Sequence, residues 1–151
     1  MSKVVPFETT LEVRDCCLCL HAQRAARALA RRFDEVLRPT GLTNQQFSLL
    51  MALNRPEPPT MAPVAELLGL DRTTLTAALK PLERRGLLLV ETDAADRRSR
   101  RLRLSEEGHA VLLHALPLWK QTHAEMGSVH PDVDMDQLRM WLRQLGSADA
   151  R

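Results

Sequence analysis

The chain has 151 residues, which fits one domain, or one domain with a helical arm for association. Its formal net charge of +2 neither indicates nor excludes a nucleic-acid partner. No apolar run approaches the roughly 20 residues needed to span a bilayer, and no signal-peptide pattern opens the chain. Cys16, Cys17 and Cys19 lie too close together for a secreted disulfide framework. We therefore expect a cytoplasmic protein without membrane association.

Residues 9–38 are predicted to form one long helix. Thr9 and Glu12 have the spacing of a capping box, and apolar residues recur at helical spacing until Pro39 and Gly41. At 1.5 Å per residue this helix would span about 45 Å, which is longer than the core of a small domain requires. The excess length indicates contact with a partner subunit.

A second helix is predicted from Thr43 to about Asn54, with Gln46 completing another capping box. A proline-rich connection follows, and it leads to two short helices over residues 61–68 and 71–85. Two short helices joined by a tight turn are typical of a helix-turn-helix.

A basic hairpin comes next, with strands predicted over residues 87–92 and 101–104 and a tip over 93–100. Arginine carries a permanent charge and a planar set of donors, which suits phosphate and groove recognition. Clustered charge of this kind is the electrostatic footprint of a nucleic-acid-binding surface. The alternative is a solvated, salt-bridged loop. The cluster contains five arginines: Arg97, Arg98, Arg100, Arg101 and Arg103.

Two further helices are predicted after the hairpin. Ser105 is expected to cap a helix that runs to about Met126, is kinked at Pro117 and is stopped by Gly127. The last helix, over residues 135–145, carries its apolar side chains on one stripe.

The helix over residues 71–85 has the pattern of a DNA reader. Leu75, Leu79 and Leu82 fall on one face, while hydroxyl and basic side chains fall on the opposite face. In helix-turn-helix proteins the N-terminal part of the second helix meets the bases of the major groove. An ordinary amphipathic core helix would explain the apolar face equally well. The candidate DNA-binding residues of this helix are Arg72, Thr73, Thr74, Thr76 and Lys80.

These segments resemble the multiple antibiotic resistance regulator (MarR) family of winged-helix transcription factors, over nearly the whole chain. The resemblance rests on Leu67–Thr76 and Leu82–Leu87, and above all on Asp93–Arg98 followed by Leu104–Gly108. The family's wing pattern is filled by Asp96, Arg98, Leu104, Ser105 and Gly108.

The resemblance implies a mainly α fold with a small two- to three-stranded antiparallel β wing. A winged helix-turn-helix over residues 43–104 would be flanked by dimerisation helices over 9–38 and 105–147. It further implies a homodimer that reads near-palindromic double-stranded DNA, with half-sites about 10 bp apart. Arg98 would enter the minor groove, oriented by a bidentate contact with Asp96. The other candidate wing contacts are Arg97 and Arg100.

The resemblance also implies a small amphipathic or aromatic effector that releases a repressor from DNA. Candidate liners of its site are Leu20, Met51 and Trp119. The alternative is a peroxide sensor in which Cys19 is oxidised. That branch of the family holds its cysteine with tyrosines, and this chain has none. Equally, the three cysteines could be small apolar residues at a subunit interface.

We expect no cofactor, no metal and no enzymatic activity. The histidines are scattered without a zinc-motif spacing, and there is no glycine-rich phosphate loop or nucleophile elbow. A winged-helix module that binds protein is the remaining alternative. A protein-binding face would be more apolar and aromatic than this arginine-rich hairpin, so the sequence favours DNA.

Overall fold

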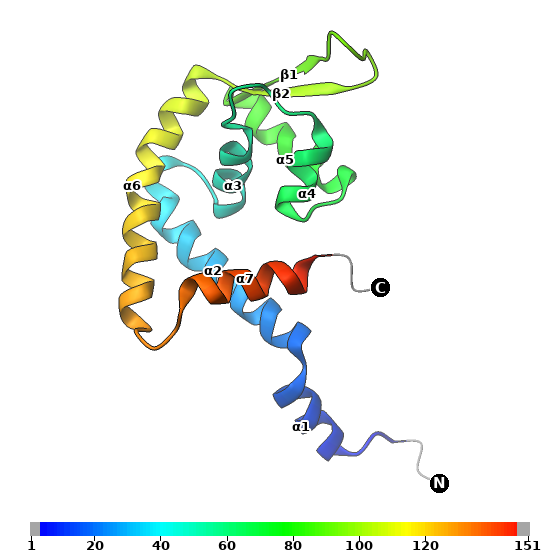
Figure 1. Cartoon of the computed structure of the whole chain (residues 1–151), viewed down its shortest axis with the longest axis vertical. Coiled ribbons are helices and arrows are strands. Elements are labelled where there is room, and N and C mark those ends of the chain that lie inside the picture. Colours follow the sequence, from blue (N-terminus) through cyan, green and yellow to red (C-terminus); the bar gives the residue numbers. More distant parts are fainter. Residues whose placement is uncertain (1–3, 148–151) are drawn as a thin grey trace.

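The computed structural model describes residues 4–147. Within that range it contains seven α-helices, a short 3-10 helix and a two-stranded antiparallel sheet. A lobe of three short helices carries the β-hairpin at one end, and two long helices, α2 (Leu18–Leu37) and α6 (Glu106–Val129), run past the lobe (Figure 1). The predicted fold class, a mainly α winged helix-turn-helix, is confirmed. The predicted unit also includes residues 1–3 and 148–151, which lie outside the described range.

The N-terminal region forms two helices, α1 (Phe7–Cys16) and α2 (Leu18–Leu37), where one continuous helix was predicted. The break lies at Cys17, whose backbone is extended at φ −73° and ψ 108°. The Sγ of Cys17 accepts the N–H of Leu20 at 3.4 Å, so this thiol caps the start of α2. The prediction was wrong because no glycine or proline marks the break.

Two other predicted helix boundaries were also wrong. The capping box of Thr9 and Glu12 does not form, because α1 already begins at Phe7 and Thr9 lies in its first turn. Gly127 does not end its helix, which continues to Val129. A glycine costs only about 1 kcal/mol inside a helix, so it can be tolerated near a helix end.

The corner after α2 is a 3-10 turn, η1 (Arg38–Thr40), and leads into α3 (Asn44–Leu53). The predicted capping box at the start of α3 is present. The Gln46 N–H donates to the Thr43 hydroxyl at 3.2 Å, and the Thr43 N–H donates to the Gln46 side chain at 3.1 Å.

The helix-turn-helix consists of α4 (Met61–Leu68) and α5 (Arg72–Arg84), close to their predicted bounds. Gly69 ends α4 with φ +64°, in the left-handed region that favours glycine. The Leu70 N–H then donates to the carbonyl of Ala65 at 2.9 Å, which closes the turn into α5.

The wing consists of β1 (Leu88–Thr92) and β2 (Arg100–Leu104), paired antiparallel. Leu88 faces Leu104 and Val90 faces Leu102 across the hairpin, so these four side chains share one face. Leu88 and Leu102 are fully buried, and this face therefore anchors the hairpin on the core. The sheet has two strands, within the predicted two to three, and an isolated bridge joins Thr60 to Arg101.

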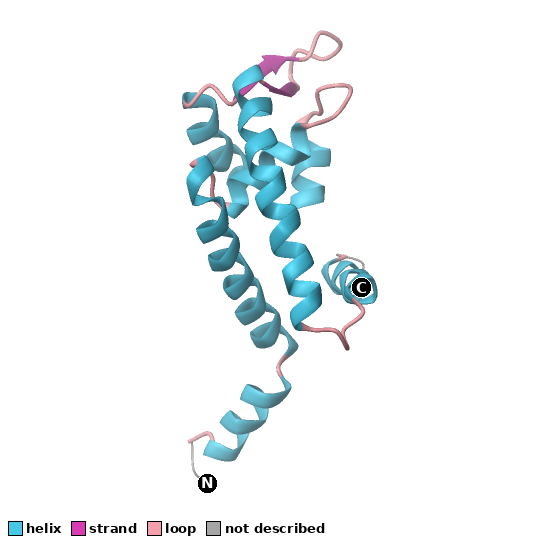
Figure 2. Ribbon diagram, turned by 90° about the vertical axis from the view of Figure 1, so that its left-hand side faces the viewer, coloured by secondary structure: helices cyan, strands magenta, loops and turns pink. Residues whose placement is uncertain are grey.

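The C-terminal region consists of α6 (Glu106–Val129) and α7 (Met135–Gly146). No residue of α1 or α7 is buried, and both helices stand away from the rest of the chain (Figure 2). Among residues 4–147, no helix is long and apolar enough to cross a membrane.

One hydrophobic core holds the winged lobe to the long helices. It contains fully buried leucines from α2, α3, α5 and the wing, among them Leu37, Leu50, Leu75, Leu82 and Leu102. Because α5 and the hairpin share this core, the position of one is tied to the position of the other.

Candidate nucleic-acid interface

The start of α5 is fixed by Asp71, as the sequence predicted. Its carboxylate accepts the N–H of Thr74 at 2.7 Å and the Thr74 hydroxyl at 2.9 Å. The backbone bond from Thr74, followed by the hydroxyl bond, lowers the pKa of Asp71 below its ordinary value. The hydroxyl hydrogen of Thr74 is thus bonded within the protein, although the residue itself is exposed.

The two faces of α5 are those that the sequence predicted. Leu75, Leu79 and Leu82 are buried in the core. The Thr76 hydroxyl donates to the carbonyl of Arg72 at 2.8 Å, so its oxygen remains available as an acceptor. The exposed polar face carries Arg72, Thr73, Thr76 and Lys80.

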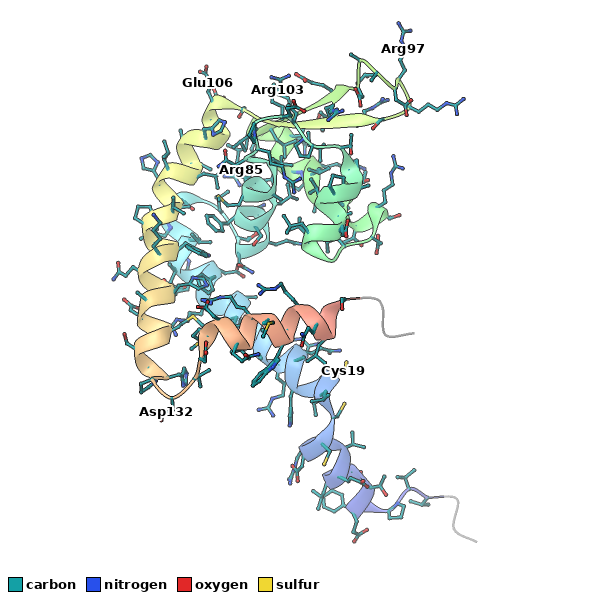
Figure 3. All side chains as sticks on the ribbon, viewed as in Figure 1. Cys19, Arg85, Arg97, Arg103, Glu106 and Asp132 are labelled. Atoms are coloured by element: carbon teal, nitrogen blue, oxygen red, sulfur yellow. The ribbon has the colours of Figure 1, made fainter. Side chains whose placement is uncertain are left out.

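The wing tip places Arg97, Arg98 and Arg100 in solvent, with Arg97 at the far end of the hairpin (Figure 3). Asp96 acts on the backbone of Arg98, because its Oδ1 accepts the Arg98 N–H at 3.0 Å. Among the residues that the structure describes, no ion pair joins Asp96 to the Arg98 guanidinium. The predicted bidentate contact is therefore replaced by a backbone turn that leaves the Arg98 side chain unrestrained.

Side chains of α5 and the wing meet in two neighbouring clefts. The first, of about 290 Å³, is lined by Arg72 together with Asp96, Arg98 and Arg100. The second, of about 280 Å³, lies between Arg72, Thr76 and Lys80 on one side and Arg100 on the other. Arg72 and Arg100 line both clefts, so α5 and the wing form one continuous basic surface.

The structure divides the five wing arginines into two groups. Arg101 pairs with Asp93 at 3.1 Å, and Arg103 pairs with Glu91 at 3.0 Å. Within residues 4–147, no carboxylate pairs with the three remaining arginines. Their charge is therefore available to an external anion, and they are the three that the sequence proposed as contacts: Arg97, Arg98 and Arg100.

Four residues of the first cleft were missed from the sequence: Thr60, Met61, Ala62 and Ser99. Thr60 is the N-cap of α4, but its side chain makes no capping hydrogen bond. A threonine before a predicted helix start could have drawn attention to it. Ser99 carried no comparable signal, because its position depends on the path of the hairpin tip.

Known proteins of one family resemble this chain. The sequence model of the MarR family matches residues 40–99. The transcriptional repressor MprA of Escherichia coli is 31% identical over 143 residues, which cover 93% of this chain and 77% of MprA. The chain belongs to the MarR family.

Solved structures extend the comparison. The transcriptional regulator MosR of M. tuberculosis, in complex with DNA, superposes with a TM-score of 0.77 at 39% identity, covering 87% of this chain and 95% of MosR. BpsR of Bordetella bronchiseptica, whose DNA binding is regulated by 6-hydroxynicotinic acid, has a TM-score of 0.75 at 26% identity, with coverages of 87% and 94%. The chain is thus a MarR-family DNA-binding transcription regulator, and these relatives are regulators, not enzymes.

This MarR-family chain also has an apolar cavity of about 360 Å³ between α3, α4 and α6. Met51 and Trp119 line it, as predicted, whereas Leu20 on α2 does not. Phe47 stacks on Trp119 with ring centroids 6.3 Å apart, so two aromatic rings form part of the wall. The remaining lining residues are Ser48, Ala52, Leu67, Leu68 and Leu116.

The cysteines lie far from the wing, around the break between α1 and α2 (Figure 3). Cys16 and Cys19 are exposed, and Cys17 is partly buried. The amide of Gln23 donates to the Sγ of Cys19 at 3.1 Å. The thiol of Cys19 is therefore open to solvent in the single chain.

Proposed function

We propose that this protein is a homodimeric, sequence-specific transcription repressor that a small molecule releases from DNA. The observation that carries the proposal is the meeting of Arg72 from α5 and Arg100 from the wing in one basic surface. Because its proposed target is chromosomal DNA, we place its action in the cytoplasm.

On DNA, α5 would lie in the major groove and the wing in the adjacent minor groove. Arg98 would enter the minor groove, where a narrow groove concentrates negative potential. The Asp96 turn supports this role, because it fixes the backbone from which Arg98 projects. The full set of proposed contacts is Arg72, Thr73, Thr74, Thr76, Lys80, Arg97, Arg98 and Arg100.

The homodimer is proposed from the uncovered apolar side chains at the two ends of the chain. Phe7 of α1 is 67% exposed, and Trp141 and Leu145 of α7 are 56% and 67% exposed. On α7 the exposed apolar side chains are spaced as one helical stripe, and an exposed stripe of this kind marks an interaction site that a second copy can cover symmetrically. The dimerisation regions proposed for residues 9–38 and 105–147 include most of these side chains. Two-fold symmetry then requires a near-palindromic operator, with half-sites about 10 bp apart.

Effector release is proposed through the cavity between α3, α4 and α6. Its volume, about 360 Å³, falls in the range of small-molecule sites. No charged side chain lines it, which favours an uncharged aromatic ligand. Because α4 belongs to the helix-turn-helix and α6 to the long-helix region, a ligand between them would favour a different spacing of the two reader helices. It would shift the equilibrium only by its difference in affinity for the two states.

Peroxide sensing through Cys19 is the second candidate, and the exposure of its thiol favours it. An organic hydroperoxide would transfer one oxygen atom to the thiolate as its O–O bond breaks, which gives a sulfenic acid and releases the corresponding alcohol. If Cys19 senses peroxide, peroxide treatment releases the wild-type protein from DNA, while the Cys19→Ser variant stays bound. Equal release of both proteins, or of neither, would rule out Cys19 as the sensor.

The proposed function is tested by selecting duplexes from a random pool with the purified, reduced protein and measuring their affinity by fluorescence anisotropy. The expected result is a near-palindromic sequence, bound at least about a thousandfold more tightly than a scrambled duplex. Equal affinity for both duplexes would contradict sequence-specific reading. Absence of binding even at low salt would instead favour a protein-interaction module.

A further inference from the structure

Arg101 connects the wing to a segment outside the hairpin. Its Nε and Nη2 each lie 3.1 Å from Oδ2 of Asp93, at the first position of the wing tip. Its Nη1 donates to the carbonyl of Pro58 at 2.9 Å. The Asp93 side chain is 12% exposed and the Arg101 side chain 37%, so the carboxylate end of this ion pair is shielded from water.

The same segment is bonded to the wing through the backbone. The N–H of Leu102 donates to the carbonyl of Pro59 at 2.8 Å, and Thr60 forms a bridge with Arg101. Thr60 is directly followed by Met61, the first residue of α4. The contacts of Arg101 therefore join the wing to the start of the helix-turn-helix.

Asp93 also shapes the wing tip itself. Its Oδ1 accepts the N–H of Ala95 at 3.0 Å, and its own N–H donates to the carbonyl of Ser99 at 3.1 Å. These two bonds close the tip, while Oδ2 holds Arg101. The backbone bond from Ala95, with a further contribution from Arg101, lowers the pKa of Asp93.

Strand alternation separates Arg101 from the DNA-facing arginine beside it. Successive side chains of a strand point to opposite faces. Arg100 faces the second cleft with Arg72, whereas Arg101 faces Asp93 and Pro58.

We propose that Arg101 is a positioning residue for DNA binding: with Asp93 and the Pro58 carbonyl it fixes the wing against the start of α4, so that Arg98 meets the minor groove while Arg101 itself contacts no phosphate. This inference rests on the proposed DNA-binding function. It separates one arginine of the basic run from its neighbours by role, although the sequence gives all of them the same charge.

The chemistry of the contact explains the choice of arginine. A guanidinium is a rigid, planar set of donors that can hold a carboxylate and a carbonyl at once. A lysine ammonium is a single point charge on a flexible stem. The Arg101→Lys variant therefore keeps the charge of the wing but cannot reproduce the double contact.

The test compares Arg101→Lys and Arg101→Ala with the matched control Arg103→Ala, using the duplex selected by the wild-type protein. Arg103 lies on the same strand and pairs with Glu91 across the hairpin, whereas Arg101 also reaches Pro58 outside the hairpin. Arg101→Lys is expected to bind at least about fivefold more weakly than the wild type, close to Arg101→Ala, whereas Arg103→Ala changes affinity less. Affinity of Arg101→Lys equal to that of the wild type would overturn the proposal, because charge alone would then suffice.

A second comparison uses the Arg98→Ala variant. If Arg101 acts through the placement of Arg98, adding Arg101→Ala to Arg98→Ala weakens binding by less than about twofold further. Losses that multiply would show that Arg101 contacts DNA independently and would also overturn the proposal.

A third readout needs no DNA. Amide hydrogen exchange of the free protein should show faster exchange at Leu102 in Arg101→Lys and unchanged exchange within α5. If the wild type binds no selected duplex, the proposed function fails, while unchanged exchange at Leu102 would by itself reject the fixing of the wing by Arg101.

Discussion

Replacing Gly108 with alanine is expected to destabilise the protein, although a glycine-to-alanine substitution inside a helix usually stabilises it. Gly108 lies in the first turn of α6, where the Ser105 hydroxyl oxygen accepts its N–H at 3.0 Å. The same hydroxyl donates to the carbonyl of Gly86 at 2.6 Å, so this turn is bonded to the middle of the α5–β1 connection. An added Cβ at Gly108 would lie 2.1 Å from the carbonyl oxygen of Leu87 and 2.8 Å from Cδ1 of Leu104.

The magnitude follows from two opposing effects. Alanine improves helix propensity over glycine by at most about 1 kcal/mol. Against this, relieving a 2.1 Å contact to the 3.0 Å that real Cβ atoms respect requires a shift of about 0.9 Å between the helix and backbone at the base of the wing. Overpacking of this kind costs about 1–3 kcal/mol, and a backbone atom cannot rotate away as a side chain can. We expect a net destabilisation of about 2 kcal/mol, or a fall in Tm of about 4–8 °C.

The matched control is Gly127→Ala in the same helix, where an added Cβ meets no atom within 4 Å. Thermal unfolding followed by circular dichroism should show opposite signs, with a lower Tm for Gly108→Ala and an equal or higher Tm for Gly127→Ala. An equal or raised Tm for Gly108→Ala would contradict the close approach of Gly108 to the carbonyl oxygen of Leu87.

Three further predictions follow from the proposed dimer, the cavity and the aspartates. Trp141→Asp should weaken the homodimer by at least about 2 kcal/mol, roughly 30-fold in Kd, because a buried tryptophan is a typical interface anchor. Analytical ultracentrifugation measures this change, and an unchanged dimer would place α7 outside the interface. Met51→Trp should fill the cavity, so that 2-naphthol, used as an uncharged aromatic probe, needs at least about tenfold higher concentration to release DNA, a loss of about 1.4 kcal/mol. Release at the wild-type concentration would place the effector elsewhere. The lowered pKa values of Asp71 and Asp93 predict stability that is present above their ordinary value of 3.8 and is lost as the pH falls through their lower folded values. Thermal unfolding between pH 7 and about pH 2 should show this loss, and the double Asp→Asn variant should show a smaller one; an equal acid dependence would contradict the assignment.

The helix starts that the sequence predicted correctly are those with a local chemical signal. Thr43, Asp71 and Ser105 each accept a backbone N–H of the first helical turn. Such a cap depends on three or four consecutive residues, so it can be recognised without knowledge of the fold. The wing and the reader helix were predicted for the same reason, since their patterns are short and contiguous.

The break at Cys17 could not be predicted in this way. The residues around it favour a helix, and neither glycine nor proline interrupts them. The interruption is stabilised by the Cys17 thiol, a weak acceptor that is not among the usual helix caps. In addition, most of the first half of α2 is exposed in the single chain, so no intrachain core dictates its path.

The sequence also could not distinguish the roles of all five wing arginines. Arg97, Arg98 and Arg100 were proposed as contacts, and the structure leaves their charges without a carboxylate partner within residues 4–147. Arg101 is distinguished by Asp93 and by the carbonyl of Pro58, which is 43 residues away in the chain. Contacts between distant segments depend on the fold, and a charge pattern does not contain them.

The most direct test of DNA reading by α5 and the wing is the salt dependence of affinity for the selected duplex. Each phosphate neutralised by the protein contributes about −0.9 to the slope of log K against log salt. A steep slope is expected for the wild type. For the variant with alanine at Arg97, Arg98 and Arg100, the expected slope is shallower by about two to three per protomer. An unchanged slope would contradict the central claim, because these arginines would then not face DNA.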